Sequence, residues 1–140
     1  MSNGVTAEPV ELLRLADGEN SVVIRVLGRR DESGELDAEV LVASTFCNGG
    51  LPLRLSPADL DDWAAALDEL ALGRDACWMT DLRNPEINVE FSTRFAVPLV
   101  TVEDVQGSGT AMAVPVDLAD GWVAEQRARL ARVRGEWSAQ

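Results

Sequence analysis

The 140-residue sequence contains no histidine, no lysine and no tyrosine. Histidine bases, lysine Schiff bases and tyrosine acids are therefore excluded, and no ordinary base is present to activate a serine or cysteine nucleophile. The chain also lacks a glycine-rich loop ending in Gly-Lys and a GxGxxG dinucleotide fingerprint. These absences remove most catalytic machinery and predict a protein that is not an enzyme and uses no cofactor.

Cysteine is scarce, and the two residues, Cys47 and Cys77, are not spaced as a metal-binding pair. Both fall in segments expected to be strand or strand edge, so we expect two buried free thiols, no metal and a reducing compartment. The N-terminus lacks a basic region followed by an apolar run, and the longest mainly apolar segment, residues 95–102, is far too short to cross a membrane. The sequence therefore predicts a cytoplasmic protein without a membrane segment.

Basic residues are in the minority, because 24 acidic residues face only 12 basic ones, all arginine, for a net charge of -12. Nucleic-acid binding requires a basic surface that neutralises phosphates, so this balance argues against a nucleic-acid partner. A charged partner would instead be a basic protein. The alternative is that the acidity serves only to keep a small protein soluble.

Period-2 alternation of apolar residues dominates the chain and predicts a mostly antiparallel β-sheet of about eight strands. After a loose polar tail at residues 1–9, one domain is expected over residues 10–137. Turns are expected at residues 17–20, at Asn48-Gly49-Gly50 and at Gly107-Ser108-Gly109. The expected strands are residues 10–15, 21–27, 36–44, 51–55, 76–79, 86–91, 95–105 and 110–118.

Two helices complete the expected α+β fold, one after each group of four strands. Ser56 as the N-cap, Pro57 at the first helical position and Gly73 as the stop signal predict a helix over residues 56–72. A second apolar stripe predicts a helix over about residues 120–134. Hairpin connections and the absence of β-α-β crossovers indicate α+β rather than α/β architecture.

Three of the four tryptophans are interpreted as core residues. Trp63 and Trp122 lie on the apolar stripes of the two helices and Trp78 lies within a strand, whereas Trp137, near the end of the chain, is expected to be exposed. Trp63 and Trp122 each follow a short strand and a helix cap. This similarity indicates either a weak duplication of a unit of four strands and a helix, or a chance likeness between two strand-to-helix junctions.

Carboxylates are the one catalytic option that remains, as an acid/base pair or as metal ligands. Asp59, Asp61 and Asp62 form the densest group, but on a helix they point in different directions and the helix dipole explains their position. The face of this helix turned away from its apolar stripe is the candidate surface for a basic protein partner. Its acidic residues are Asp61, Asp62, Asp68 and Glu69.

Two other classes of function remain open. A small-ligand binder or carboxylate-based enzyme would show a converging pair of buried carboxylates in a cleft between sheet and helices. A purely structural subunit would show a large exposed apolar patch. The arginines of the last helix favour an intramolecular role, because the first helix offers carboxylates to pair with them. They are Arg127, Arg129, Arg132 and Arg134.

Three segments together resemble a small uncharacterised domain family of high-GC Gram-positive bacteria. They are residues 11–29 (ELLRLADGENSVVIRVLGR), residues 36–73, which include LSPADLDDWAAALDELALG, and residues 114–134 (VPVDLADGWVAEQRARLARVR). That family implies no activity. More distantly, the layout of strands, helix and further strands over about residues 21–118 is similar to WapI-like immunity proteins, which neutralise secreted toxins of contact-dependent competition. This second resemblance implies an immunity-type binding protein, although the layout has no counterpart of the arginine-rich last helix.

Overall fold

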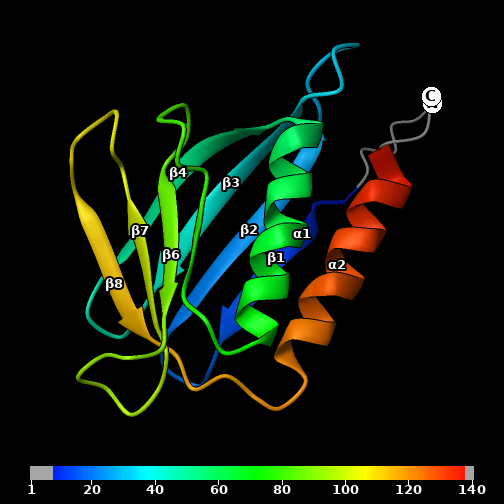
Figure 1. The fold of residues 1–140 in the computed structure, drawn as a ribbon. Helices are drawn as coiled ribbons and strands as arrows, with labels where there is room; N and C mark the ends of the chain where they lie inside the picture. The colour runs from blue at the N-terminus through cyan, green and yellow to red at the C-terminus, as the bar shows by residue number, and fades with distance from the viewer. Residues whose placement is uncertain (1–7, 138–140) are drawn as a thin grey trace.

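The computed structural model describes residues 8–137, so most of the expected tail lies outside the described residues. The chain forms two four-stranded antiparallel sheets, each with its strands in sequential order and each followed by a helix (Figure 1). This confirms the predicted α+β fold. The first half contains β1 (Val10–Ala16), β2 (Ser21–Arg29), β3 (Leu36–Ala43), β4 (Asn48–Leu55) and α1 (Pro57–Ala71). The second half contains β5 (Ala76–Trp78), β6 (Glu86–Glu90), β7 (Leu99–Glu103), β8 (Ala111–Pro115) and α2 (Trp122–Trp137).

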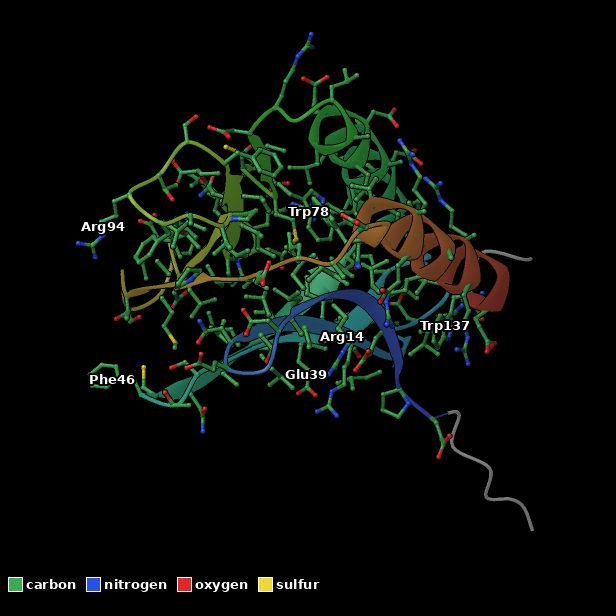
Figure 2. The ribbon with its side chains drawn as sticks, turned by 90° about the horizontal axis from the view of Figure 1, so that it is seen from below. Arg14, Glu39, Phe46, Trp78, Arg94 and Trp137 are labelled. Atoms are coloured by element: carbon green, nitrogen blue, oxygen red, sulfur yellow. The ribbon has the colours of Figure 1, made fainter. Side chains whose placement is uncertain are left out.

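Both helices and the second sheet lie on one face of the first sheet, and the core fills the space between these layers (Figures 1 and 2). The opposite face of the first sheet carries Arg14 and Glu39 and is turned to solvent (Figure 2). Alternation decides which side chains are buried: along β3, every second residue from Leu36 to Val42 is in the core. The core also includes Leu60, Trp63 and Leu67 of α1 and Val89, Val100 and Val102 of the second sheet.

The start of α1 follows from its sequence. Ser56 and Asp59 form a reciprocal capping box, in which the Ser56 hydroxyl accepts from the Asp59 N–H at 3.1 Å and the Asp59 carboxylate accepts from the Ser56 N–H at 2.9 Å. Pro57 occupies the first turn, and Gly73 adopts a φ of 76° just beyond the helix. The predicted boundaries of α1 are therefore correct within one residue at each end.

The predicted turn at Asn48-Gly49-Gly50 is wrong, because these residues begin β4 and pair with β3. The turn lies at residues 44–47, where the Ser44 hydroxyl accepts from the N–H groups of Phe46 and Cys47. Gly50 serves close packing: a Cβ there would lie 2.9 Å from a methyl carbon of Leu41. Phe46 at the tip of this turn is 94% exposed (Figure 2).

The strands β7 and β8 are shorter than predicted. Pro98 has no N–H to add to the ladder, and β7 begins directly after it. The Asp104 carboxylate accepts from the N–H groups of Gly107 and Ser108, which turns the chain just after β7. The predicted turn around residues 107–109 is thus confirmed, while the flanking strands lose residues at both ends.

The tryptophans and cysteines depart in part from expectation. Trp63 and Trp78 are buried as predicted and stack with ring centroids 4.8 Å apart, whereas Trp122 is only half-buried. Trp137, predicted to be exposed, packs against the core because α2 continues to this residue.

Cys47 and Cys77 are free, but both are exposed rather than buried. The first lies in the β3–β4 turn, and the second points outward from β5.

Each edge strand of the first sheet is capped at one residue by an amide side chain. Gln126 of α2 accepts from the backbone N–H of Arg14 on β1 at 2.8 Å and donates to the Arg14 carbonyl at 3.0 Å. Asn84 makes the same pair of bonds with the backbone of Arg54 on β4, at 3.0 and 2.9 Å. Each amide satisfies one backbone donor and one acceptor that an edge strand would otherwise leave unpaired.

Replacing Gln126 with leucine should lower the free energy of unfolding by about 1–3 kcal/mol, because it removes both partners of the Arg14 backbone at a fully buried position. Arg132→Leu, on the exposed side of the same helix, should change stability by less than about 0.5 kcal/mol. Chemical denaturation of the two variants measures the difference. Equal midpoints for Gln126→Leu and the unmodified protein would contradict this role.

Candidate functional site

A groove of about 460 Å³ lies between α1 and β5, and we call it the acidic groove. One wall is a stripe of α1, formed by Asp59, Asp62, Ala65, Ala66 and Glu69. The other wall is β5 with its flanking residues, from Asp75 to Asp81. Positions 59, 62, 66 and 69 recur at spacings of three or four. The helix therefore presents these residues on one side, next to its buried apolar stripe.

Trp78 joins the two walls at the N-terminal end of α1. Its indole nitrogen donates to the Asp59 carbonyl at 2.9 Å, and its ring stacks on Trp63 with an interplanar angle of 29°. Both indoles are almost fully buried. The position of β5 beside α1 is therefore fixed by apolar stacking and one buried hydrogen bond.

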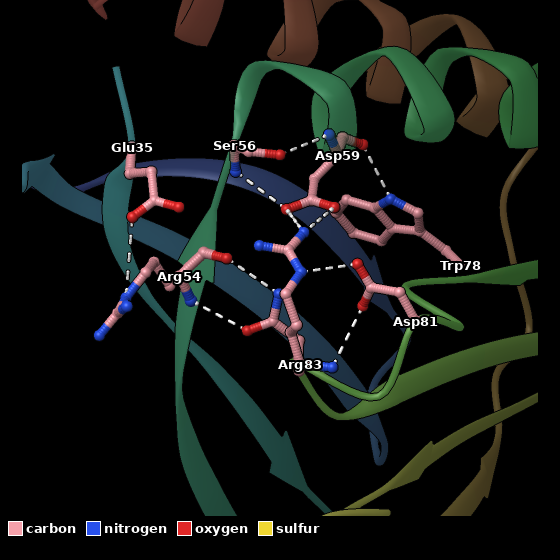
Figure 3. A network of polar contacts seen from close by, with 8 residues as sticks. Glu35, Arg54, Ser56, Asp59, Trp78, Asp81 and Arg83 are labelled. Atoms are coloured by element: carbon pink, nitrogen blue, oxygen red, sulfur yellow. Dashed lines mark hydrogen bonds and ion pairs between the residues drawn. The ribbon is translucent and has the colours of Figure 1, made fainter. Parts of the chain in front are cut away.

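A polar network holds the loop that follows β5 (Figure 3). Arg83 donates to both oxygens of the Asp59 carboxylate at 3.2 and 3.3 Å, and its Nε donates to Asp81 at 2.7 Å. The hydrogen bond from Arg83 holds the pKa of Asp81 below its ordinary value. Met79 and Leu82 adopt positive φ angles of 62° and 71°, which side chains rarely adopt, and this network stabilises the loop in that conformation.

Asp59 is the one buried carboxylate among residues 8–137, and its oxygens are already used by the capping box and by Arg83. The converging pair of buried carboxylates expected for an acid/base enzyme is therefore not found in the described part of the chain. No group of three or more acidic or cysteine side chains within residues 8–137 is placed to hold a metal ion.

The four acidic residues singled out from the sequence lie on two different sides of α1. Asp61 forms an ion pair with Arg134, and Asp68 forms one with Arg127 at 2.9 Å, so both face α2. Asp62 and Glu69 instead line the acidic groove. This division follows from helix geometry, because adjacent residues are rotated by about 100° around the axis.

The arginines of α2 partly follow the prediction. Arg127 and Arg134 pair with carboxylates of α1, as expected. Arg129 pairs instead with Glu11 of β1 at 3.1 Å and with Glu125 of its own helix at 2.7 Å. The pairs made by Arg127 and Arg134 are largely exposed and each worth little in stability, but they offset the charge on the α2 side of α1.

The acidic surface extends from the groove onto the outer face of the second sheet, which the sequence analysis missed. The pKa of Cys77 is raised, first by partial burial and then by the negative charges of Glu86, Glu90 and Asp75. On the same face Glu86 pairs directly across the ladder with Glu103, a like-charge pairing that disfavours the sheet. Alternation with Ile87 and Val89 in the sequence places Glu86 and Glu90 outward, but it does not reveal their neighbours.

We expect Cys77 to react more slowly than Cys47 with a neutral thiol reagent near pH 7.5, because its raised pKa leaves less thiolate. The difference should narrow as the pH rises and as salt screens the nearby carboxylates. Stopped-flow measurements on Cys47→Ser and Cys77→Ser variants isolate each thiol. A Cys77 that reacts faster than Cys47 at low salt would contradict this electrostatic environment.

The structure thus defines an α+β protein of two antiparallel sheets and two helices, with an acidic groove between α1 and β5. The chain belongs to a family of unknown function, DUF5959, whose family model matches residues 10–138. No curated protein and no solved structure matches the chain significantly. Within residues 8–137, no helix combines the length and the apolar character needed to cross a membrane.

Proposed function

We propose that this protein is a cytoplasmic, non-enzymatic binding domain that uses its acidic surface to hold a basic protein partner. The supporting observation is a set of carboxylates on one side of the molecule that no arginine neutralises. Among the described residues, Asp62, Asp75, Glu86 and Glu90 make no ion pair, although they lie in or beside the acidic groove.

Electrostatics supports a partner of opposite charge. Neighbouring carboxylates repel one another, so a surface that brings arginine or lysine side chains against them relieves this repulsion. The net charge of -12 also attracts a basic protein over a longer range and speeds its encounter with this surface. By contrast, Asp61 and Asp68 are already paired with arginines of α2 and have less to gain. Glu69 in the groove has one partner, the exposed Arg74 at 3.4 Å, whereas Asp62 has none among the described residues.

The proposed role is of the immunity or regulatory type, in a high-GC Gram-positive bacterium. The sequence resemblances described above suggest this setting, in which an acidic protein would neutralise a basic toxin made by the same cell. The proposal requires no catalytic group of this chain, in keeping with its lack of histidine, lysine and tyrosine.

The test is the rate of association between this protein and a basic protein encoded beside it. Asp62→Arg combined with Glu69→Arg should lower the association rate by about tenfold or more at low salt, and the effect should shrink above about 0.15 M salt. Asp61→Arg combined with Asp68→Arg is the matched control, with the same charge change on the α2 side of the same helix, and should have a smaller effect.

Two outcomes would overturn this proposal. Association rates that are identical for all variants and independent of salt would show that neither side of α1 recognises the partner. If the protein bound no basic protein encoded beside it, its acidic residues would have only the alternative role of keeping the protein soluble. A larger effect of the control pair would move the recognition surface from the groove to the α2 side.

A further inference from the structure

We infer that β5 is a docking edge, to which an extended basic segment of the partner adds as a further β-strand inside the acidic groove. This inference rests on the proposed function and specifies how the partner is held. It depends on the unpaired edge of β5, on the dimensions of the groove and on its charge.

β5 is an edge strand with a single neighbour. It pairs with β6 alone, through residues Ala76 to Trp78. Alternate N–H and C=O groups of an edge strand point away from its sheet, here toward the groove that these residues line. In the part of the chain that the structure describes, no hydrogen bond joins the backbone of residues 76–80 to a group outside the sheet.

In the first sheet, an amide side chain caps one residue of each edge strand. Gln126 and Asn84 each satisfy one N–H and one C=O, on β1 and β4 respectively. No described side chain does this for β5, which instead borders a groove. Ala76 is half-buried and Cys77 is exposed, so this part of the edge is open to the backbone of another chain, whereas Trp78 is buried.

The groove is as long as a short strand. Its α1 wall runs from Asp59 to Glu69, a length of about 15 Å at the rise of an α-helix. An extended segment of about four or five residues has the same length. The groove lining includes the small side chains of Ala65, Ala66 and Ala76, which allow another backbone to approach closely.

Charge identifies the occupant as a basic segment. Asp62, Glu69 and Asp75 line the groove, and Glu86 and Glu90 lie near Cys77 on the adjoining sheet face. Side chains of an added strand alternate between the two faces of the sheet, so a segment with arginine or lysine at every second position would meet these carboxylates. The same charges disfavour pairing with the β5 edge of a second copy of this acidic chain.

The probe is a capped peptide of about seven residues with alternating arginine and valine. Two further peptides of the same charge carry N-methyl groups on alternate residues, one peptide on its odd-numbered residues and the other on its even-numbered residues. Each therefore lacks the N–H donors along one of its two edges. The unmodified peptide should bind with a salt-dependent affinity, and the N-methyl peptide of one register should bind about tenfold more weakly or worse. Fluorescence polarisation of labelled peptides measures both.

A pair of protein variants locates the docking edge. Ala65→Arg places a bulky cation in the groove on an exposed position of α1, and it should weaken peptide binding by about tenfold or more. Ala71→Arg adds the same charge on the same helix outside the groove, and it should have a much smaller effect. Circular dichroism checks that both variants stay folded.

The outcomes separate this inference from the proposed function. Equal, salt-dependent binding of all three peptides would overturn strand addition while leaving the acidic surface as a site for basic proteins. The same conclusion follows if the peptides fail to bind but the intact basic partner binds. Failure of both the peptides and the partner to bind would overturn the two together.

Discussion

Replacing Trp63 with alanine should lower the free energy of unfolding by about 3–5 kcal/mol, a large share of the ~5–15 kcal/mol that holds a typical domain folded. Trp63 is 1% exposed, and its ring stacks on Trp78 with centroids 4.8 Å apart. Truncation would leave a cavity between α1 and the sheets and remove the support of the Trp78 indole. Chemical denaturation monitored by circular dichroism measures the change in midpoint.

Two controls sharpen this expectation. Trp122→Ala should cost clearly less, because Trp122 is only half-buried, although both tryptophans occupy apolar stripes in the sequence. Trp63→Phe should also cost less than Trp63→Ala, since it keeps an aromatic ring and removes an indole nitrogen that is buried without a hydrogen-bond partner among the described residues. Equal costs for Trp63→Ala and Trp122→Ala would contradict this account of the core.

Replacing Asp59 with alanine should lower the free energy of unfolding by about 2–4 kcal/mol. The variant loses the reciprocal cap with Ser56, for which substitution costs about 0.5–2 kcal/mol. It also loses the charge-assisted hydrogen bonds from Arg83, which are worth about 1.5–3 kcal/mol for a buried acceptor and less here because Arg83 is half-exposed. Asp59 itself is 3% exposed, so water does not replace these bonds fully.

The matched variants are Asp59→Asn and Asp61→Ala. Asparagine keeps an oxygen for the Ser56 N–H but not the charge that holds Arg83, so its cost should fall between those of the unmodified protein and Asp59→Ala. Asp61 lies two residues further along α1, is exposed, and should change stability by less than about 0.5 kcal/mol. If Asp59→Ala were as mild as Asp61→Ala, the network would not hold the β5–β6 loop.

Local patterns in the sequence determined the order of the elements. Period-2 alternation indicates a strand wherever one face is buried, as along β3 and β6, because successive side chains point to opposite faces. The signals at Ser56, Pro57 and Gly73 act within one helical turn, so they predict α1 closely. Neither signal needs information from distant parts of the chain.

Glycine and cysteine are two residue types whose environment the sequence did not determine. Gly49 and Gly50 match both a turn and a strand that approaches its neighbour closely, and contact with β3 decides for the strand. Cys77 lies in a strand, as its apolar context suggests. Its side chain is nevertheless exposed, because β5 turns that face outward in the second sheet.

The candidate surface shows the same division between local and tertiary information. The sequence determined that Asp61, Asp62, Asp68 and Glu69 point away from the apolar stripe of α1, since helical periodicity alone sets that direction. Only the tertiary structure decided that two of them meet arginines of α2 and that two line a groove beside β5. The partner of an exposed carboxylate depends on which distant element packs next to its helix, and no local pattern encodes that neighbour.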